Sequence, residues 1–81
     1  MTTREKDIRF DYSKLRGRIV EKYGSVANYC NETGRDKATF YTKLTTGGFF
    51  KQETIIAIAQ SLDIPEAEYI AYFFTPVVVK S

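Results

Sequence analysis

The residues of this chain whose types and spacing could do chemistry lie between Gly34 and the glycine pair at 47–48. In a helix over residues 36–45, Phe40 and Leu44 stand four residues apart and would face a core. The opposite side of that helix would carry Lys37, Ala38, Tyr41 and Thr42. Lysine can donate to O6 and N7 of guanine, threonine can hydrogen-bond or place its methyl against that of thymine, and alanine permits close approach. The pattern favours a surface that reads base edges, and the plain alternative is a polar, solvated helix.

The segments on either side of this helix offer groups that suit phosphates. Ser25 is expected to begin the preceding helix, whose free backbone N–H groups form a natural phosphate site. The residues that follow the 36–45 helix offer hydroxyls and accessible amides, with two lysines nearby to neutralise phosphate charge. These flanking residues are Lys43, Thr45, Thr46, Gly47 and Lys51.

The composition argues against catalysis and against a metal site. The chain contains no histidine and a single cysteine, Cys30. The usual triads and the commonest metal ligand are therefore lacking, as is any intramolecular disulfide. Carboxylates are present, but no nucleophile, histidine or phosphate loop flanks them. We expect no enzyme activity, no metal, no cofactor and no small-molecule substrate.

Length and charge limit the architecture and suggest a partner. A chain of 81 residues with 43% apolar residues predicts one folded domain over residues 1–81. Up to Lys51 there are eleven Lys and Arg against six Asp and Glu, whereas from Gln52 onward there is one Lys against four acids. This asymmetry suits a polyanion at one end of the chain. No apolar run is long enough to span a membrane, and no secretory signal begins the chain, so a cytoplasmic location is expected.

Apolar periodicity and capping residues predict five short helices in an all-α domain. Asp11, Ser25 and Asp36 suit helix starts, and Gly24 and Gly34 suit helix ends. Proline lacks a backbone N–H, so the proline at position 65 suits the first turn of the last helix. The predicted ranges are roughly 12–23, 25–33, 36–45, 51–62 and 65–73.

The two end segments have the composition of strands. Ile8 and Phe10 alternate with charged residues, and Val77 to Val79 are β-branched. A lone strand leaves its backbone groups unpaired. We therefore expect these segments to pair with each other or across a dimer, the alternative being two unpaired tails.

The second and third predicted helices have the sequence form of a helix-turn-helix. Two helices of about eight to ten residues, joined by a tight turn that contains glycine, are typical of that motif. In it the second helix lies in the major groove of DNA while the first crosses above it. The order of the elements therefore assigns the groove-reading role to the helix at 36–45.

Several stretches of the chain resemble one family of such domains. They are "FDYSKLRGRI" (10–19), "YGS" (23–25), the turn at Gly34, "ATFYTKL" (38–44), the helix after Phe50, "DIPEAE" (63–68) and "YFFT" (72–75). In these stretches the chain is similar to the Cro/C1-type helix-turn-helix domains of phage repressors, the lambda repressor-like fold, and especially to small phage Cro-like proteins. The resemblance covers residues 10–76.

The resemblance implies a five-helix domain that binds double-stranded operator DNA as a homodimer and represses transcription. Carried over by position, base-reading roles fall on Asp36, Lys37, Ala38, Tyr41 and Thr42. Phosphate roles fall on Val26 through its backbone amide, and on Thr45 and the loop after it. The apolar end of the chain, "YIAYFF" followed by "VVV", favours self-association through the fifth helix and the C-terminal segment.

Three positions depart from the family pattern, and one other reading stays open. Thr33 and Arg35 flank the turn glycine where apolar residues are usual, and Cys30 replaces a small alanine. Cys30 is expected to pack between the two motif helices, and Arg35 becomes free to reach a phosphate. The same apolar chain end also favours a protein-interaction module built on this fold. Such a module would bind another regulator and show no salt-dependent DNA binding.

Overall fold

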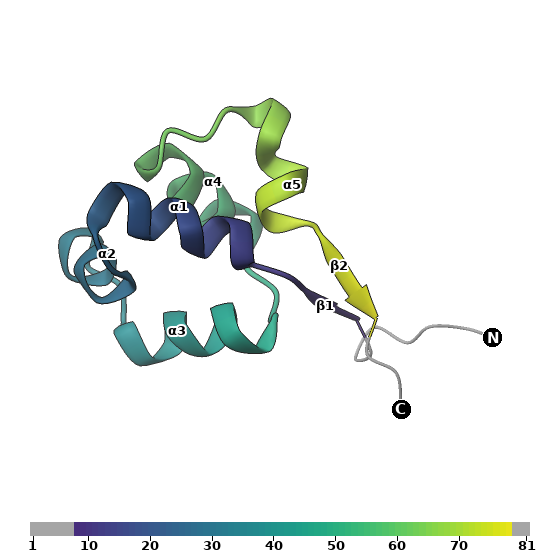
Figure 1. Ribbon diagram of the computed structural model, residues 1–81, viewed down its shortest axis with the longest axis horizontal. Coiled ribbons are helices and arrows are strands. Elements are labelled where there is room, and N and C mark those ends of the chain that lie inside the picture. The colour runs from purple at the N-terminus through teal and green to yellow at the C-terminus, as the bar shows by residue number, and fades with distance from the viewer. Residues whose placement is uncertain (1–7, 79–81) are drawn as a thin grey trace.

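The computed structural model describes residues 8–78, and this part of the chain folds into five α-helices and one two-stranded antiparallel sheet (Figure 1). In chain order the elements are β1 (Ile8–Phe10), α1 (Ser13–Tyr23), α2 (Val26–Thr33), α3 (Lys37–Thr46), α4 (Gln52–Ser61), the 3-10 turn η2 (Glu66–Glu68), α5 (Tyr69–Phe73) and β2 (Pro76–Val78). The predicted five-helix, mainly α fold with a small sheet of the chain ends is confirmed.

Local capping chemistry determines where α2 and α3 begin and end. The Ser25 hydroxyl accepts a hydrogen bond from the Asn28 backbone N–H at 3.0 Å, and an Asp36 carboxylate oxygen accepts one from the Thr39 N–H at 2.9 Å. Each bond satisfies a donor that has no partner within its helix. Left-handed glycines close both helices, as expected. The predicted ranges are longer at their starts because they counted the capping residues.

Two of the predicted helix starts are wrong. Tyr12, not Asp11, is the residue before α1, and the Asp11 carboxylate instead accepts from the N–H and hydroxyl of Ser13. Pro65 lies outside the last helix in extended backbone, and its carbonyl accepts from Glu68 in the 3-10 turn. The α-helix therefore starts only at Tyr69. Tight 3-10 turns are common at helix ends, and apolar periodicity does not distinguish them from α-helix.

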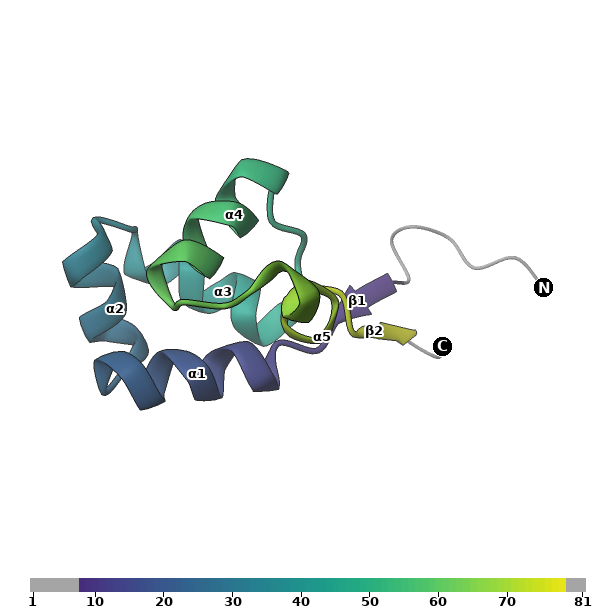
Figure 2. The same cartoon turned by 90° about the horizontal axis from the view of Figure 1, so that it is seen from above.

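The core lies between the helices, with α3 beneath the space that separates α1 from α4 (Figures 1 and 2). Its fully enclosed side chains include Leu15, Ile19, Tyr29, Cys30, Ile58, Leu62 and Phe73. Cys30 is buried in this core, as expected of a packing residue. The Thr33 hydroxyl donates to the Tyr29 carbonyl at 2.7 Å, so a polar residue fits beside the turn without an unpaired group.

The sheet joins the two ends of the chain beside the end of α3 (Figure 1). β1 and β2 pair antiparallel with Ile8 opposite Val78 and Phe10 opposite Pro76. The expected pairing of the ends with each other is confirmed for these residues, whereas Val79 lies outside the described part. The Phe10 N–H also donates to the Gly47 carbonyl at 3.1 Å. The sheet therefore anchors the loop that follows α3.

Candidate nucleic-acid interface

The exposed surface of α3 carries four of the five side chains that the sequence analysis assigned to base reading. Phe40 and Leu44 are buried and hold the helix against the core. The exposed residues of the helix include Lys37, Ala38, Tyr41 and Thr42. Tyr41 follows Lys37 and Thr42 follows Ala38 by about one turn, so the four residues form two adjacent rows along the helix. The structure thus brings these four residues together.

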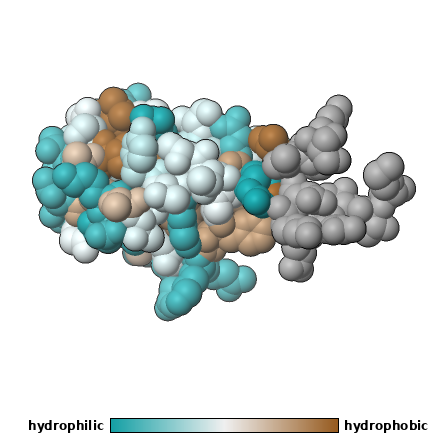
Figure 3. Space-filling view, turned by 90° about the horizontal axis from the view of Figure 1, so that it is seen from below, coloured by the Kyte–Doolittle hydropathy of each residue, from teal (hydrophilic) through white to brown (hydrophobic). Residues whose placement is uncertain are grey.

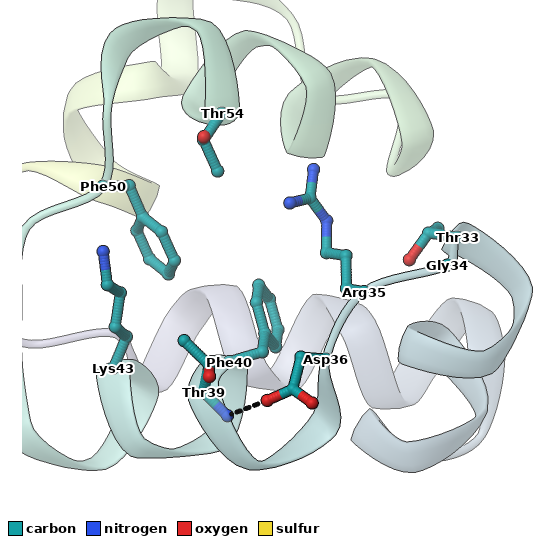
Figure 4. Close-up of a pocket in the computed structure, with 9 residues that line it drawn as sticks. All are labelled: Thr33, Gly34, Arg35, Asp36, Thr39, Phe40, Lys43, Phe50 and Thr54. Atoms are coloured by element: carbon teal, nitrogen blue, oxygen red, sulfur yellow. Dashed lines mark hydrogen bonds between the residues drawn. The ribbon is translucent and has the colours of Figure 1, made fainter.

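Asp36 has a different position from the other predicted base-reading residues. Its carboxylate caps α3, as the dashed hydrogen bond to Thr39 shows in Figure 4. Hydrogen bonding with Thr39 holds the pKa of Asp36 below its usual value. The ionised carboxylate is thus committed to the start of α3, although the residue itself is exposed.

Three of the four threonine hydroxyls of α3 are turned back onto the helix. Thr42 donates to the Ala38 carbonyl at 2.8 Å, and Thr46 donates to the Thr42 carbonyl at 2.7 Å. Thr45 donates to the Tyr41 carbonyl at 3.1 Å. Such bonds to the preceding turn are typical of helical threonines. They use the hydroxyl proton and leave the oxygen lone pairs as acceptors.

Arg16 of α1 lies beside the candidate interface and was not predicted from the sequence. Its guanidinium carbon lies 5.3 Å from the centroid of the Tyr41 ring, and its Nη2 lies 3.4 Å from the Tyr41 hydroxyl. Both side chains are exposed, with Tyr41 44% accessible. Periodicity places Arg16 outside the apolar stripe of its helix. No local signal shows that α1 lies alongside α3, so the contact with Tyr41 could not be predicted.

Arg35 and Lys43, two of the cations predicted to bind phosphate, point into a hollow between α3 and α4 (Figure 4). They thus point away from the exposed residues 37, 38, 41 and 42, which are called the reading face below. The hollow has a volume of about 400 Å³. Arg35 lies with its guanidinium 5.9 Å from the Phe40 ring, and its buried Nε has no hydrogen-bond partner among residues 8–78. The Lys43 ammonium donates to the Phe49 carbonyl at 2.8 Å and lies 5.4 Å from the Phe50 ring.

The remaining predicted phosphate residues lie at the two ends of the motif. Ser25 and Val26 begin α2 next to Ala38 and Tyr41, all four lining one hollow. The exposed residues after the reading face are Thr45, Thr46 and Lys51. The expectation that Gly47 offers an accessible amide is wrong. Gly47 is buried against β1, and its N–H donates to the Lys43 carbonyl at 3.0 Å as the bond that closes α3.

Three cations near α3 form no ion pair within the described residues. The ion pairs found over 8–78 are Arg18 with Glu21 and Lys22 with Asp63. Arg16, Lys37 and Lys51 take part in neither. A cation outside any ion pair stays available to an anionic partner.

The face that carries α3 is shown from below in Figure 3. Most of its described surface is hydrophilic or near neutral, with hydrophobic patches toward the α2 end and toward the sheet. Over residues 8–78 there is no helix with the length and apolarity to cross a bilayer. The same residues contain no group of three or more His, Cys, Asp or Glu placed to hold a metal ion.

One protein family matches this chain. The family described as "Protein of unknown function (DUF739)" matches residues 8–76. The match runs from β1 to the first residue of β2 and includes every helix. Comparison with curated proteins finds no match.

Proposed function

The chain belongs to the DUF739 family, and we propose that it binds double-stranded DNA sequence-specifically with α3 in the major groove. One observation carries the proposal. A ten-residue helix, held down by Phe40 and Leu44 and bordered by the turns at Gly34 and Gly47, exposes Lys37, Ala38, Tyr41 and Thr42 in two adjacent rows. An α-helix of this size fits the major groove, where each base pair shows a distinct pattern of donors and acceptors.

The chemistry of that face suits base readout. Lys37 lies in the first turn of α3, which is the end that reaches base edges in helix-turn-helix proteins. Its ammonium can donate to O6 and N7 of guanine. The Thr42 hydroxyl already donates a hydrogen bond to the Ala38 carbonyl. Its oxygen can still accept one from the N6 amino group of adenine or the N4 amino group of cytosine. Ala38 allows the helix to approach closely.

Phosphate contacts would surround this face. The N–H groups of Val26 and the next residue have no acceptor inside α2, as at any helix start. Ser25 lies beside them, and Thr45, Thr46 and Lys51 follow the reading face. Arg35 and Lys43 would reach phosphates by extending out of the hollow between α3 and α4.

The finer proposal is a Cro-like repressor of phage or prophage type that acts in the cytoplasm as a homodimer. A helix-turn-helix dimer binds two half-sites related by a two-fold axis, which doubles the contacts of one domain. Ile70 of α5 and Phe74 just after it are exposed apolar residues one turn apart. They support self-association through the fifth helix and the C-terminal segment.

Two lysine variants test the proposal. Lys37→Ala should cost roughly 1–3 kcal/mol on the preferred site and relax specificity at one base pair, because it removes a base contact. Lys51→Ala serves as the matched control, since this exposed lysine precedes α4 and would meet only phosphate. It should weaken all sequences alike and lower the salt slope by about 0.9.

Sites selected from random duplexes would supply the specific DNA for titrations at several salt concentrations. Equal losses for both variants on specific and random DNA would make α3 a general basic surface and contradict direct readout. A protein that binds no duplex but forms a stable complex with another regulator would support the interaction module instead. The exposed Ile70 and Phe74 side chains are the observation that favours that second candidate.

A further inference from the structure

An apolar hollow of about 640 Å³ lies where α1, the start of α2 and the start of α3 meet. Val20 of α1 lines this hollow with 45% of its surface exposed. Burying an apolar side chain such as valine is favourable in free energy, so this exposure leaves stabilisation unused. The full lining is Arg16, Val20, Gly24, Ser25, Val26, Ala27, Lys37, Ala38 and Tyr41. Figure 3 shows hydrophobic surface toward the same end of the α3 face. The hollow thus opens beside the reading face.

The hollow combines an aliphatic floor with positive charge at its margin. Arg16 and Lys37 are both exposed, and neither forms an ion pair within residues 8–78. The start of α2 adds backbone N–H groups and the positive end of a helix dipole. An apolar surface bordered by cations and amide donors matches a chain of alternating sugars and phosphates.

Arg16 has donors left for such a partner. The guanidinium has five N–H donors, and the one hydrogen bond it makes within residues 8–78 goes to the Tyr41 hydroxyl. Its carbon also lies over the Tyr41 ring, which orients both groups. A guanidinium held in this way can still bind phosphate with two parallel N–H groups.

We propose that this hollow seats the sugar–phosphate backbone of one DNA strand and that Arg16 binds one of its phosphates. Deoxyribose carbons would cover Val20 and Ala27, while phosphates would meet Arg16 at one end and the start of α2 at the other. The proposal rests on the DNA-binding function above, and it extends the interface from α2 and α3 to α1. In this arrangement Tyr41, oriented by its contact with Arg16, would lie between the base edges and the DNA backbone.

The first test compares Arg16→Gln with Lys14→Gln, which removes a charge from the same helix on another side. The Lys14 ammonium lies 4.9 Å from the Tyr72 ring of α5 and does not line the hollow. Arg16→Gln should lower the salt slope of binding to any duplex by about 0.9. The ratio of the wild-type binding constant to that of Arg16→Gln should then fall about 3.5-fold between 50 and 200 mM salt. Lys14→Gln should keep the wild-type slope, and Arg16→Lys should restore it.

A second test adds charge to the floor of the hollow. Val20→Lys places an ammonium where the strand is expected and should raise the salt slope by about 0.9 while tightening binding at low salt. Gln60→Lys adds the same charge to an exposed position on α4 and should change neither quantity. Thermal unfolding of each variant shows whether the fold is kept.

The outcomes separate this proposal from the function on which it rests. If the wild type binds DNA with a clear salt slope while Arg16→Gln and Val20→Lys match it, the strand path is wrong and the DNA-binding function stands. If the wild type binds no DNA, both fall. The assignment would also be overturned if Lys14→Gln or Gln60→Lys changed the salt slope as much as the hollow variants do. Any surface charge would then act alike.

Discussion

Tyr12 shows how one polar atom connects two distant parts of the fold. Its side chain is only 3% exposed and packs against Phe50, with ring centroids 5.2 Å apart. Its hydroxyl donates to the Gly48 carbonyl at 2.7 Å, so the start of α1 is tied to the loop after α3. Burial raises the pKa of Tyr12 to about 12. The hydroxyl therefore stays protonated as a donor well into alkaline solution.

Tyr12→Phe should lower the free energy of unfolding at pH 8 by roughly 1–3 kcal/mol, because the Gly48 carbonyl loses its donor. The wild type should also lose stability between about pH 10 and 12. Below pH 10 both states keep the proton, whereas above it the unfolded state, with the ordinary tyrosine pKa of about 10, releases the proton first. Urea unfolding at pH 8, 10 and 11 would measure both effects.

The Tyr12→Phe variant is the control for this alkaline loss, because it lacks the hydroxyl whose pKa burial raises. If Tyr12→Phe showed the same alkaline decline as the wild type, the titration of Tyr12 would not be its cause.

The positions of side chains could be predicted from the sequence only where helical spacing decides them. Phe40 and Leu44 stand one turn apart, and both face inward as their spacing predicts. Lys37 stands seven residues before Leu44, on almost the same line along the helix, and yet it is exposed at the start of α3. The long side chain of Arg35 could point to solvent or inward, and local pattern does not choose between them. The partnership of Arg16 with Tyr41 depends on how α1 packs beside α3, which spacing within one helix does not contain.

At the scale of elements, the two glycines that close α2 and α3 have the same backbone geometry but different surroundings. Gly34 and Gly47 have φ values of 72° and 76°, in the left-handed region that favours glycine. A Cβ on Gly34 would meet nothing within 4 Å. A Cβ on Gly47 would lie 2.6 Å from the Phe10 carbonyl oxygen and 2.9 Å from the Phe10 nitrogen. The second glycine therefore also makes room for β1.

The pair gives a matched prediction. Gly34→Ala should cost about 1–2 kcal/mol of unfolding free energy, the strain of a left-handed non-glycine residue. Gly47→Ala should cost clearly more, because backbone atoms of β1 must also move. It should speed amide exchange at Phe10, whose N–H donates to Gly47, while Gly34→Ala should not. Equal costs and unchanged exchange would mean that the contact between β1 and the loop adds no stability.

The boundaries of α2 and α3 followed from local chemistry, whereas the starts of α1 and α5 and the pairing of the strands did not. Ser25 and Asp36 cap their helices as expected because their acceptors lie within the same turn. The 3-10 turn at Glu66–Glu68 was missed, since its residues carry no apolar pattern to distinguish it. Strand composition at the chain ends left two partners open, and the pairing of β1 with β2 depends on how the helices bring the ends together.

Across the whole molecule, apolar surface remains uncovered where the sheet meets α4 and α5. The Phe10 ring lies 5.1 Å from that of Phe49 and 5.8 Å from that of Phe74, between centroids. Phe49 and Phe74 are both exposed and border an apolar cavity of about 260 Å³. Ile70, one turn before Phe74, is 73% exposed. Aromatic and aliphatic surface gathered in this way is typical of an interface between proteins.

If the protein is a homodimer through α5 and the C-terminal segment, Ile70→Glu should raise the dimer dissociation constant by about 100-fold or more. A two-fold interface contains each residue twice, and each buried isoleucine contributes roughly 1.5–3 kcal/mol. Sedimentation over a range of concentrations would measure this shift, with Ile56→Glu on α4 as the control of similar chemistry. The same variant should bind a two-fold symmetric site more weakly while its affinity for a single half-site stays unchanged, because the reading face of α3 is untouched. A wild type that sediments as a monomer at every concentration would contradict the dimer. The lysine variants would then test the contacts of a single domain with its half-site.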